Sequence, residues 1–229
     1  MEAVTVSGRA GLARTREAIA AWGLGAWLLV LLVFAGLYAA FNNGATSIPQ
    51  ESRLQVGIAA TGMLCGLGIA AGALRAGREA LAWSGVAMLT GFALWSLLSA
   101  LWSAAPDESW LAANRAVGYS IVVAVASVAA ANTRSAPRGV AVALAAAAML
   151  VALYAIGGKI VPGLHVAFLD LNPGDEFSRV REPIGYWNGV GILCVMAAPA
   201  CIWLAGFPDA SSRLRIGALL ALTVLVLTT

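Results

Sequence analysis

The chain has 229 residues, of which 61% are hydrophobic and only 11% are charged, and its mean hydropathy is +0.86. Soluble domains carry about 25% charged residues, so this composition excludes an ordinary soluble domain and favours a polytopic membrane protein. The formal net charge of +3 reflects how basic residues are divided between loops and requires no nucleic-acid partner.

Long charge-free windows predict transmembrane helices, because about 20 apolar residues cross about 30 Å of hydrocarbon. These windows are continuous runs rich in Ala, Leu and Gly rather than short alternating segments, which favours helices over a β-barrel. The sequence therefore predicts an all-α, polytopic transmembrane helix bundle with about seven spans, at 22–40, 54–74, 81–101, 117–131, 140–156, 186–203 and from 214 onward. The seventh reaches only about 24 Å at 1.5 Å per residue, so we expect it to be truncated.

The first apolar segment follows Arg9, Arg14 and Arg16, which resemble the charged start of a signal peptide. Its apolar run is longer than is usual for a signal peptide, and no small-x-small cleavage pattern follows before Asn42. We therefore expect a retained signal anchor. The domain division is a cytoplasmic N-terminal tail at 1–21 and a transmembrane domain at 22–229.

Several residues inside the spans carry packing signals. Gly62 and Gly66, and then Gly68 and Gly72, have the small-xxx-small spacing that lets helix backbones approach closely in lipid. We expect them to pack helices within one chain rather than to form a dimer interface. Pro199 predicts a kink in the sixth span, because proline removes a backbone donor. The three cysteines, Cys65, Cys194 and Cys201, all fall in predicted spans, where a free thiol acts as a small apolar group.

The connecting loops predict the orientation. With the N-terminus in the cytoplasm, nine of the fourteen basic residues lie in inside loops, as the positive-inside rule expects. Most acidic residues lie in outside loops. The predicted location is the cytoplasmic (inner) membrane, with multiple spans and a cytoplasmic N-terminus.

Two outside loops contain candidate functional residues. Arg115 lies between Trp110 and the fourth span, where an arginine either extends to the lipid headgroups or serves a function, and the sequence leaves both open. The loop at about 157–185 contains the only histidine, His165. No second histidine, cysteine pair or carboxylate cluster completes a metal site, so we expect neither a metal nor a cofactor. The catalytic residues stay unknown.

Arg179 and Arg181 close this loop at the predicted outer membrane face. A guanidinium group binds phosphate with two parallel hydrogen bonds and keeps its charge, so the pair predicts a site for the diphosphate of a lipid-linked donor. The alternative is a solvated loop in which Glu176 and Glu182 pair with these arginines.

Three stretches carry a family resemblance: Trp95-Ser-Leu-Leu-Ser-Ala-Leu-Trp-Ser-Ala-Ala-Pro106, Asn114-Arg-Ala-Val-Gly-Tyr119 and Arg181-Glu-Pro-Ile-Gly-Tyr-Trp-Asn-Gly-Val-Gly191. Across roughly residues 80 to 229, the chain resembles the N-terminal half of the O-antigen ligase and polymerase superfamily, in the form common in actinobacteria. The first two spans are generic. A complete member has about a dozen spans, so the resemblance implies that this chain is the first half of a larger ligase-like domain.

The resemblance implies a metal-independent membrane glycosyltransferase of polysaccharide biosynthesis in the cell envelope. Such an enzyme moves a glycan from an undecaprenyl diphosphate carrier to a glycan or lipid acceptor at the outer face of the cytoplasmic membrane. The implied partners are the lipid-linked oligosaccharide donor, the acceptor and membrane lipids. Arg115, Arg179 and Arg181 are carried over as diphosphate contacts; His165 matches no family motif. A small-molecule transporter and a noncatalytic truncated membrane protein stay as alternatives, and we expect this chain alone to be inactive in transfer.

Overall fold

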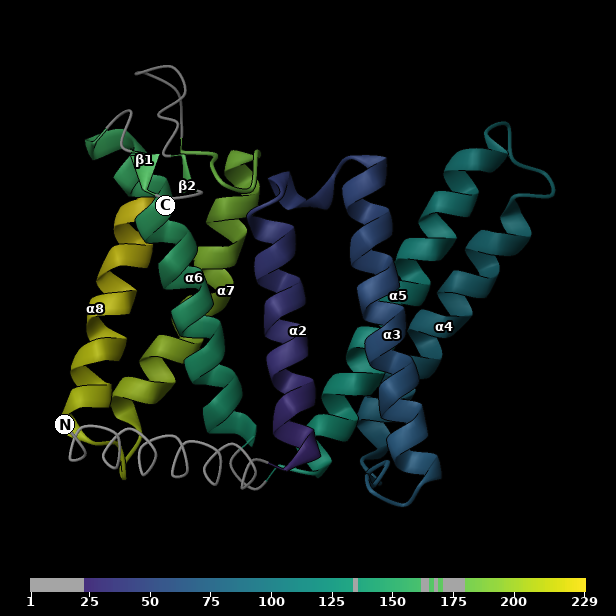
Figure 1. Cartoon of the computed structure of the whole chain (residues 1–229), viewed down its shortest axis with the longest axis horizontal. Coiled ribbons are helices and arrows are strands. Elements are labelled where there is room, and N and C mark those ends of the chain that lie inside the picture. Colours follow the sequence, from purple (N-terminus) through teal and green to yellow (C-terminus); the bar gives the residue numbers. More distant parts are fainter. Residues whose placement is uncertain (1–22, 134–135, 162–164, 167–168, 171–179) are drawn as a thin grey trace, which may run out of the picture. The chain divides into compact units, whose positions relative to one another are not determined.

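The computed structural model describes residues 23–133, 136–161, 165–166, 169–170 and 180–229 (Figure 1). The predicted N-terminal tail, Arg134 and Arg179 lie outside these residues. In chain order the elements are α2 (Leu24–Ala40), the 3-10 helix η1 (Asn43–Ala45), α3 (Ile48–Ala70), α4 (Ala80–Ser99), α5 (Pro106–Ala131), α6 (Ala136–Ile160), β1 (His165–Val166), β2 (Leu169–Asp170), α7 (Trp187–Gly206) and α8 (Ser212–Thr228).

The prediction of an all-α, membrane-type bundle is confirmed, with one α-helix for each of the seven predicted spans. Helices α3 to α7 are long and apolar enough to cross a membrane. The other two, α2 and α8, have 17 residues each and extend only about 25 Å. The two short strands pair antiparallel, with His165 opposite Asp170. Apolar side chains are exposed along every helix, as expected for helices that face lipid.

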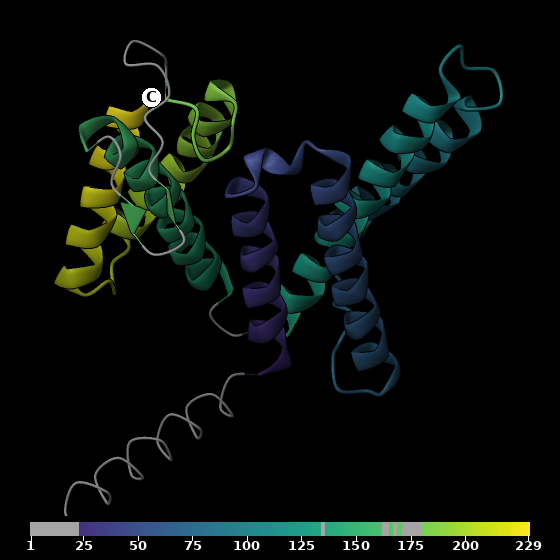
Figure 2. The same cartoon turned by 45° about the horizontal axis from the view of Figure 1, so that its top comes forward.

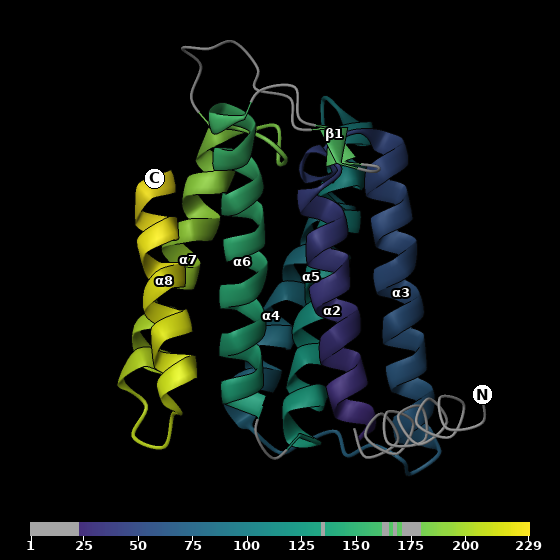
Figure 3. The same ribbon diagram turned by 60° about the vertical axis from the view of Figure 1, so that its left-hand side comes forward.

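The chain forms two compact units. The first comprises the described parts of Met1–Leu31 and Ala60–Ala136, and in it α4 and α5 pack side by side (Figures 1 and 2). The second comprises Leu32–Ala59 and Pro137–Thr229, and in it α7 packs along α8, with α6 beside them (Figure 3).

The core of the second unit is built from small residues at heptad spacing. The buried positions of α7 recur at steps of four and three residues, and those of α6 and α8 follow the same rhythm: Val190, Cys194, Ala197, Cys201 and Leu204 on α7, Ala141, Ala145, Ala148 and Ala152 on α6, and Ala218, Ala221 and Leu225 on α8. This spacing keeps one seam of each helix facing its neighbours. Two of the three cysteines belong to the seam, and all three are buried free thiols, which confirms their packing role.

Helix α5 begins earlier than the sequence predicts, at Pro106 instead of residue 117. Proline suits the first helical position, because its missing N–H has no partner there in any case. Asp107 and Glu108 occupy the first turn, where negative side chains interact favourably with the positive end of the helix dipole. As a result Arg115 lies within α5 and not in a loop before it.

The four glycines with small-xxx-small spacing, three in α3 and Gly72 just beyond it, have different surroundings. A Cβ atom on Gly62 would lie 2.6 Å from Cγ2 of Ile121 on α5, so Gly62 allows the close helix approach within one chain that its spacing predicts. Gly66 faces open space in the described structure. Gly68 and Gly72 instead belong to the end of the helix, and their predicted role as a helix-packing pair is wrong.

The end of α3 is a Schellman motif. The N–H of Ala73 donates to the carbonyl of Gly68, the N–H of Gly72 donates to that of Ile69, both at 2.9 Å, and Gly72 has φ +72°. Leu74 folds back so that its Cδ1 lies 2.6 Å from the position of a Cβ on Gly68. The left-handed Gly72 therefore ends the helix before residue 74, the predicted boundary.

Asn132, just beyond α5, binds the loop after α3 to the end of α5. The Arg75 N–H donates to Asn132 Oδ1 at 3.0 Å, and Asn132 Nδ2 donates to the Arg75 carbonyl at 2.8 Å. Nδ2 also donates to the Val128 carbonyl at 2.7 Å. The side-chain amide thus pairs with a peptide group 57 residues away in the chain.

We expect Asn132→Ala to lower the free energy of unfolding of the protein in neutral detergent by about 1–3 kcal/mol, because two backbone groups of Arg75 lose their partner. Asn132→Asp keeps the acceptor and loses both donors, so its loss should be intermediate. Thermal unfolding measures both. Asn114→Ala, the same change on α5 at a side chain with no hydrogen bond to the described residues, is the control. Equal stability of the Asn114 and Asn132 variants would refute the role of this pair.

Candidate diphosphate site

The segment before α7 is a tight turn that exposes Arg181. The Gly185 N–H donates to the Arg181 carbonyl at 2.7 Å, and Gly185 has φ +78°, a left-handed value that glycine adopts without strain. Val180 and Ile184 pack against the core of α6, α7 and α8, and Pro183 is buried. Apolar side chains on both sides thus anchor the turn and leave the Arg181 side chain exposed on the surface of the protein.

A second turn, between α2 and α3, packs against the first. Asn43, Gly44 and Ala45 all have positive φ, at 53°, 67° and 53°. A Cβ on Gly44 would lie 3.3 Å from the Ile184 carbonyl oxygen, and a Cβ on Gly185 would lie 3.3 Å from Cβ of Asn43. The two turns are therefore in close contact at glycine positions.

Side-chain hydrogen bonds and a ring contact hold the second turn in place. Asn42 Nδ2 donates to the Tyr38 carbonyl at 2.8 Å, and Thr46 Oγ1 donates to the Asn43 carbonyl at 3.0 Å. The ring of Phe41 meets that of Tyr154 on α6 edge to face, with centroids 5.3 Å apart. Ala45 is buried despite its unfavourable φ. The Asn43-Gly44 dipeptide is the local signal in the sequence that indicates this turn.

The Arg181 side chain is 52% exposed, and its Nε lies 3.6 Å from Oε1 of Glu182. An ion pair this exposed contributes at most about 1 kcal/mol, so Glu182 offers little competition to a phosphate ligand. The predicted partnership between Arg181 and Glu182 is thus present but weak, and the guanidinium stays accessible.

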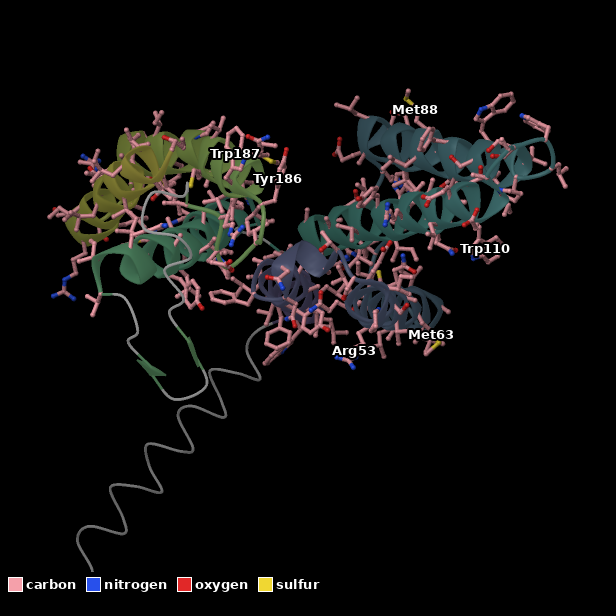
Figure 4. All side chains as sticks on the ribbon, turned by 90° about the horizontal axis from the view of Figure 1, so that it is seen from above. Arg53, Met63, Met88, Trp110, Tyr186 and Trp187 are labelled. Carbon is pink, nitrogen blue, oxygen red and sulfur yellow. The ribbon has the colours of Figure 1, made fainter. Side chains whose placement is uncertain are left out.

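Aromatic side chains flank the turn at the start of α7. Tyr186 and Trp187 are both exposed, with ring centroids 6.2 Å apart, and Figure 4 shows them at the same end of the helix. Asn188 Nδ2 donates a hydrogen bond to the Tyr186 hydroxyl. Exposed Tyr and Trp at a helix end are typical of the membrane interface. From this pattern we expect Arg181 to lie near the level of the lipid headgroups.

Of the other two predicted contacts, only Arg115 lies within the described residues. Arg115 is exposed on α5, nine residues after the helix begins, and belongs to the first unit. Arg181 belongs to the second unit. Arg179 lies outside the described residues, as do Asp175 and Glu176. The convergence of the three arginines on one diphosphate stays a prediction.

Among the described residues, no group of three His, Cys, Asp or Glu side chains is placed to hold a metal ion. His165 is described only through the backbone of β1, and its side chain lies outside what the structure describes. The chemistry that the described part of this region offers is therefore recognition of an anion by a guanidinium group, next to aromatic side chains.

A scan against protein-family models, a search of curated proteins and a search of solved structures each gave no match.

Proposed function

We propose that this chain is part of a membrane glycosyltransferase of the O-antigen ligase type. It transfers or polymerises a glycan from an undecaprenyl diphosphate carrier at the outer face of the cytoplasmic membrane. The observation that carries the proposal is the exposed guanidinium of Arg181, held on an anchored turn beside Tyr186 and Trp187. The motif resemblance in the same turn supports it.

The proposed chemistry uses the arginine as an electrostatic group. An acceptor hydroxyl attacks the anomeric carbon of the glycan and releases its proton to water, the bond from that carbon to the diphosphate oxygen breaks, and the diphosphate leaves with the carrier lipid. A fixed guanidinium stabilises the negative charge that develops on the leaving group. Holding donor and acceptor together on the membrane surface supplies further acceleration.

The experiment that tests this function is a transfer assay. Membranes from cells that express the full-length protein are supplied with a glycan on undecaprenyl diphosphate and an acceptor, and the glycan on the acceptor is measured. We expect transfer that does not depend on added metal. Substrate uptake into sealed vesicles without transfer would favour the transporter alternative and refute the proposal.

The proposed function requires the Arg181 turn to face outward, which cysteine labelling measures. We expect Asp209→Cys, in the exposed α7–α8 loop, to be protected from an impermeant thiol reagent in intact cells, and Ala104→Cys, in the exposed α4–α5 loop, to be labelled. The three native thiols are buried, so the wild-type protein is the low-background control. Labelling at residue 209 with protection at residue 104 would reverse the orientation.

A further inference from the structure

Two guanidinium groups converge on Phe207, where α7 ends and the loop to α8 begins. Arg138, in the first turn of α6, places its Cζ 5.9 Å from the centroid of the Phe207 ring. Arg215, in the first turn of α8, donates from Nη2 to the carbonyls of Phe207 and Pro208 at 3.2 and 2.9 Å. Figure 3 shows the starts of α6 and α8 and the end of α7 at the same end of this unit.

Both arginines keep hydrogen-bond donors for a ligand. An arginine has five N–H donors, and the two bonds of Arg215 come from one nitrogen, which leaves Nε and Nη1. A guanidinium held over a ring keeps its donors for other partners. In the described part of the chain, neither group lies within 4.0 Å of a carboxylate, including that of Asp209 in the same loop. One guanidinium thus lies over the Phe207 ring and the other is bonded to the backbone of the same residue, an arrangement that an anion complements.

The surface next to this pair is aromatic and faces lipid. The Trp203 ring lies one helical turn before Phe207, with centroids 5.0 Å apart, and Trp203 is 42% exposed. A cationic group at the helix end with an exposed indole beneath it matches the polarity of the bilayer interface. By the predicted topology this end is cytoplasmic, where anionic lipids attract basic residues.

We propose that Arg138, Phe207 and Arg215 form a binding site for the phosphate headgroup of an anionic phospholipid, with Trp203 against its acyl chain. The site is independent of the proposed glycosyltransferase activity, because it uses other residues at the opposite end of α7. Binding joins the first turns of α6 and α8 to the end of α7. The lipid therefore stabilises the three-helix unit that carries the Arg181 turn.

Arg213 provides a matched control. It is exposed in the first turn of α8, two residues before Arg215, and residues two apart on a helix do not share a face. Removing Arg213 or Arg215 changes the net charge of the protein by the same amount. Only the loss of Arg215 removes a group that contacts Phe207.

The test is native mass spectrometry of the full chain in neutral maltoside detergent, titrated with dioctanoyl phosphatidylglycerol or dioctanoyl phosphatidylcholine. We expect the wild-type protein to bind the anionic lipid more tightly than the zwitterionic one. Arg138→Ala and Arg215→Gln should each weaken phosphatidylglycerol binding roughly fivefold or more, and Arg213→Ala should change it by less than about twofold. Arg138→Lys should retain more affinity than Arg138→Ala.

Two outcomes would overturn the proposal. Equal losses for the Arg138, Arg213 and Arg215 variants would show that net charge alone attracts the lipid. Displacement of phosphatidylglycerol by an equal concentration of sodium phosphate would show a site for free anions rather than a lipid. Thermal unfolding checks each variant, and if Arg215→Gln does not fold, Arg138→Ala decides, because the Arg138 side chain donates no hydrogen bond to the described residues.

Discussion

Replacing Arg181 by alanine in the full-length protein is expected to lower kcat/KM for glycan transfer by roughly tenfold to a hundredfold, the largest effect on activity that we predict. The loss of a charge-assisted hydrogen bond costs about 1.5–3 kcal/mol, and about 1.4 kcal/mol corresponds to a factor of ten in rate. Arg181→Lys keeps the charge and loses the planar fork that matches a phosphate, so its loss should be smaller. The measurement is kcat/KM at matched amounts of protein in the membrane.

Glu182→Gln is the matched control for Arg181. It removes the carboxylate that lies 3.6 Å from Nε and leaves the guanidinium in place. Because that ion pair is exposed and weak, we expect Glu182→Gln to leave transfer almost unchanged. The unfolding temperature of Arg181→Ala should equal that of the wild type, since more than half of this side chain is exposed. A wild-type kcat/KM for Arg181→Ala would exclude the guanidinium as a diphosphate contact.

The largest loss of stability is expected for Gly25→Leu. A Cβ on Gly25 would lie 2.7 Å from Oγ1 of Thr133, 2.8 Å from the carbonyl oxygen of Ala129 and 2.9 Å from Cβ of Asn132. The backbone carbonyl cannot rotate away as a side chain can, so the start of α2 must move from the end of α5. Inserting atoms into such a contact typically costs 1–3 kcal/mol, and leucine should reach about 3 kcal/mol.

Gly36→Leu makes the same change on the same helix, at a position where a Cβ meets nothing within 4 Å. The difference between the two variants therefore isolates packing from helix propensity and added hydrophobicity. At roughly 2–4 °C per kcal/mol, Gly25→Leu should unfold roughly 6–12 °C below the wild type. Gly36→Leu should unfold close to the wild-type temperature. Equal unfolding temperatures for both variants would mean that the contact between Gly25 and α5 does not limit stability.

The contact between the two turns links the fold to the candidate site. Gly185 is needed because its φ is positive and because Asn43 occupies the space where a Cβ would stand. Residues far apart in sequence, near 43 and near 185, thus determine together how the Arg181 turn is held. No pattern within either segment predicts this pairing, since each segment alone reads only as a turn.

The predicted and observed ends of α5 and α3 differ, because hydrophobicity alone does not determine where a helix begins or ends. A span defined by its apolar residues excludes helical turns that carry charge, so the sequence predicts a loop for the polar first three turns of α5, which include Arg115. The same reasoning extended α3 to residue 74, past the point where the left-handed Gly72 reverses the chain. Glycine spacing likewise could not separate Gly62, which contacts Ile121, from Gly68, which accommodates Leu74.

By itself, the sequence determined the helical class, the number of α-helices among the described residues and the burial of the cysteines, because each depends on hydrophobicity summed over a whole segment. Only the tertiary structure decided which polar groups meet. Asn132 with Arg75, Asn43 with Gly185, and Arg138 and Arg215 around Phe207 are all brought together by helix packing. The physical reason is range: hydrophobic partition acts on each segment separately, whereas a hydrogen bond or a cation–ring contact requires two distant segments to lie within a few ångströms of each other.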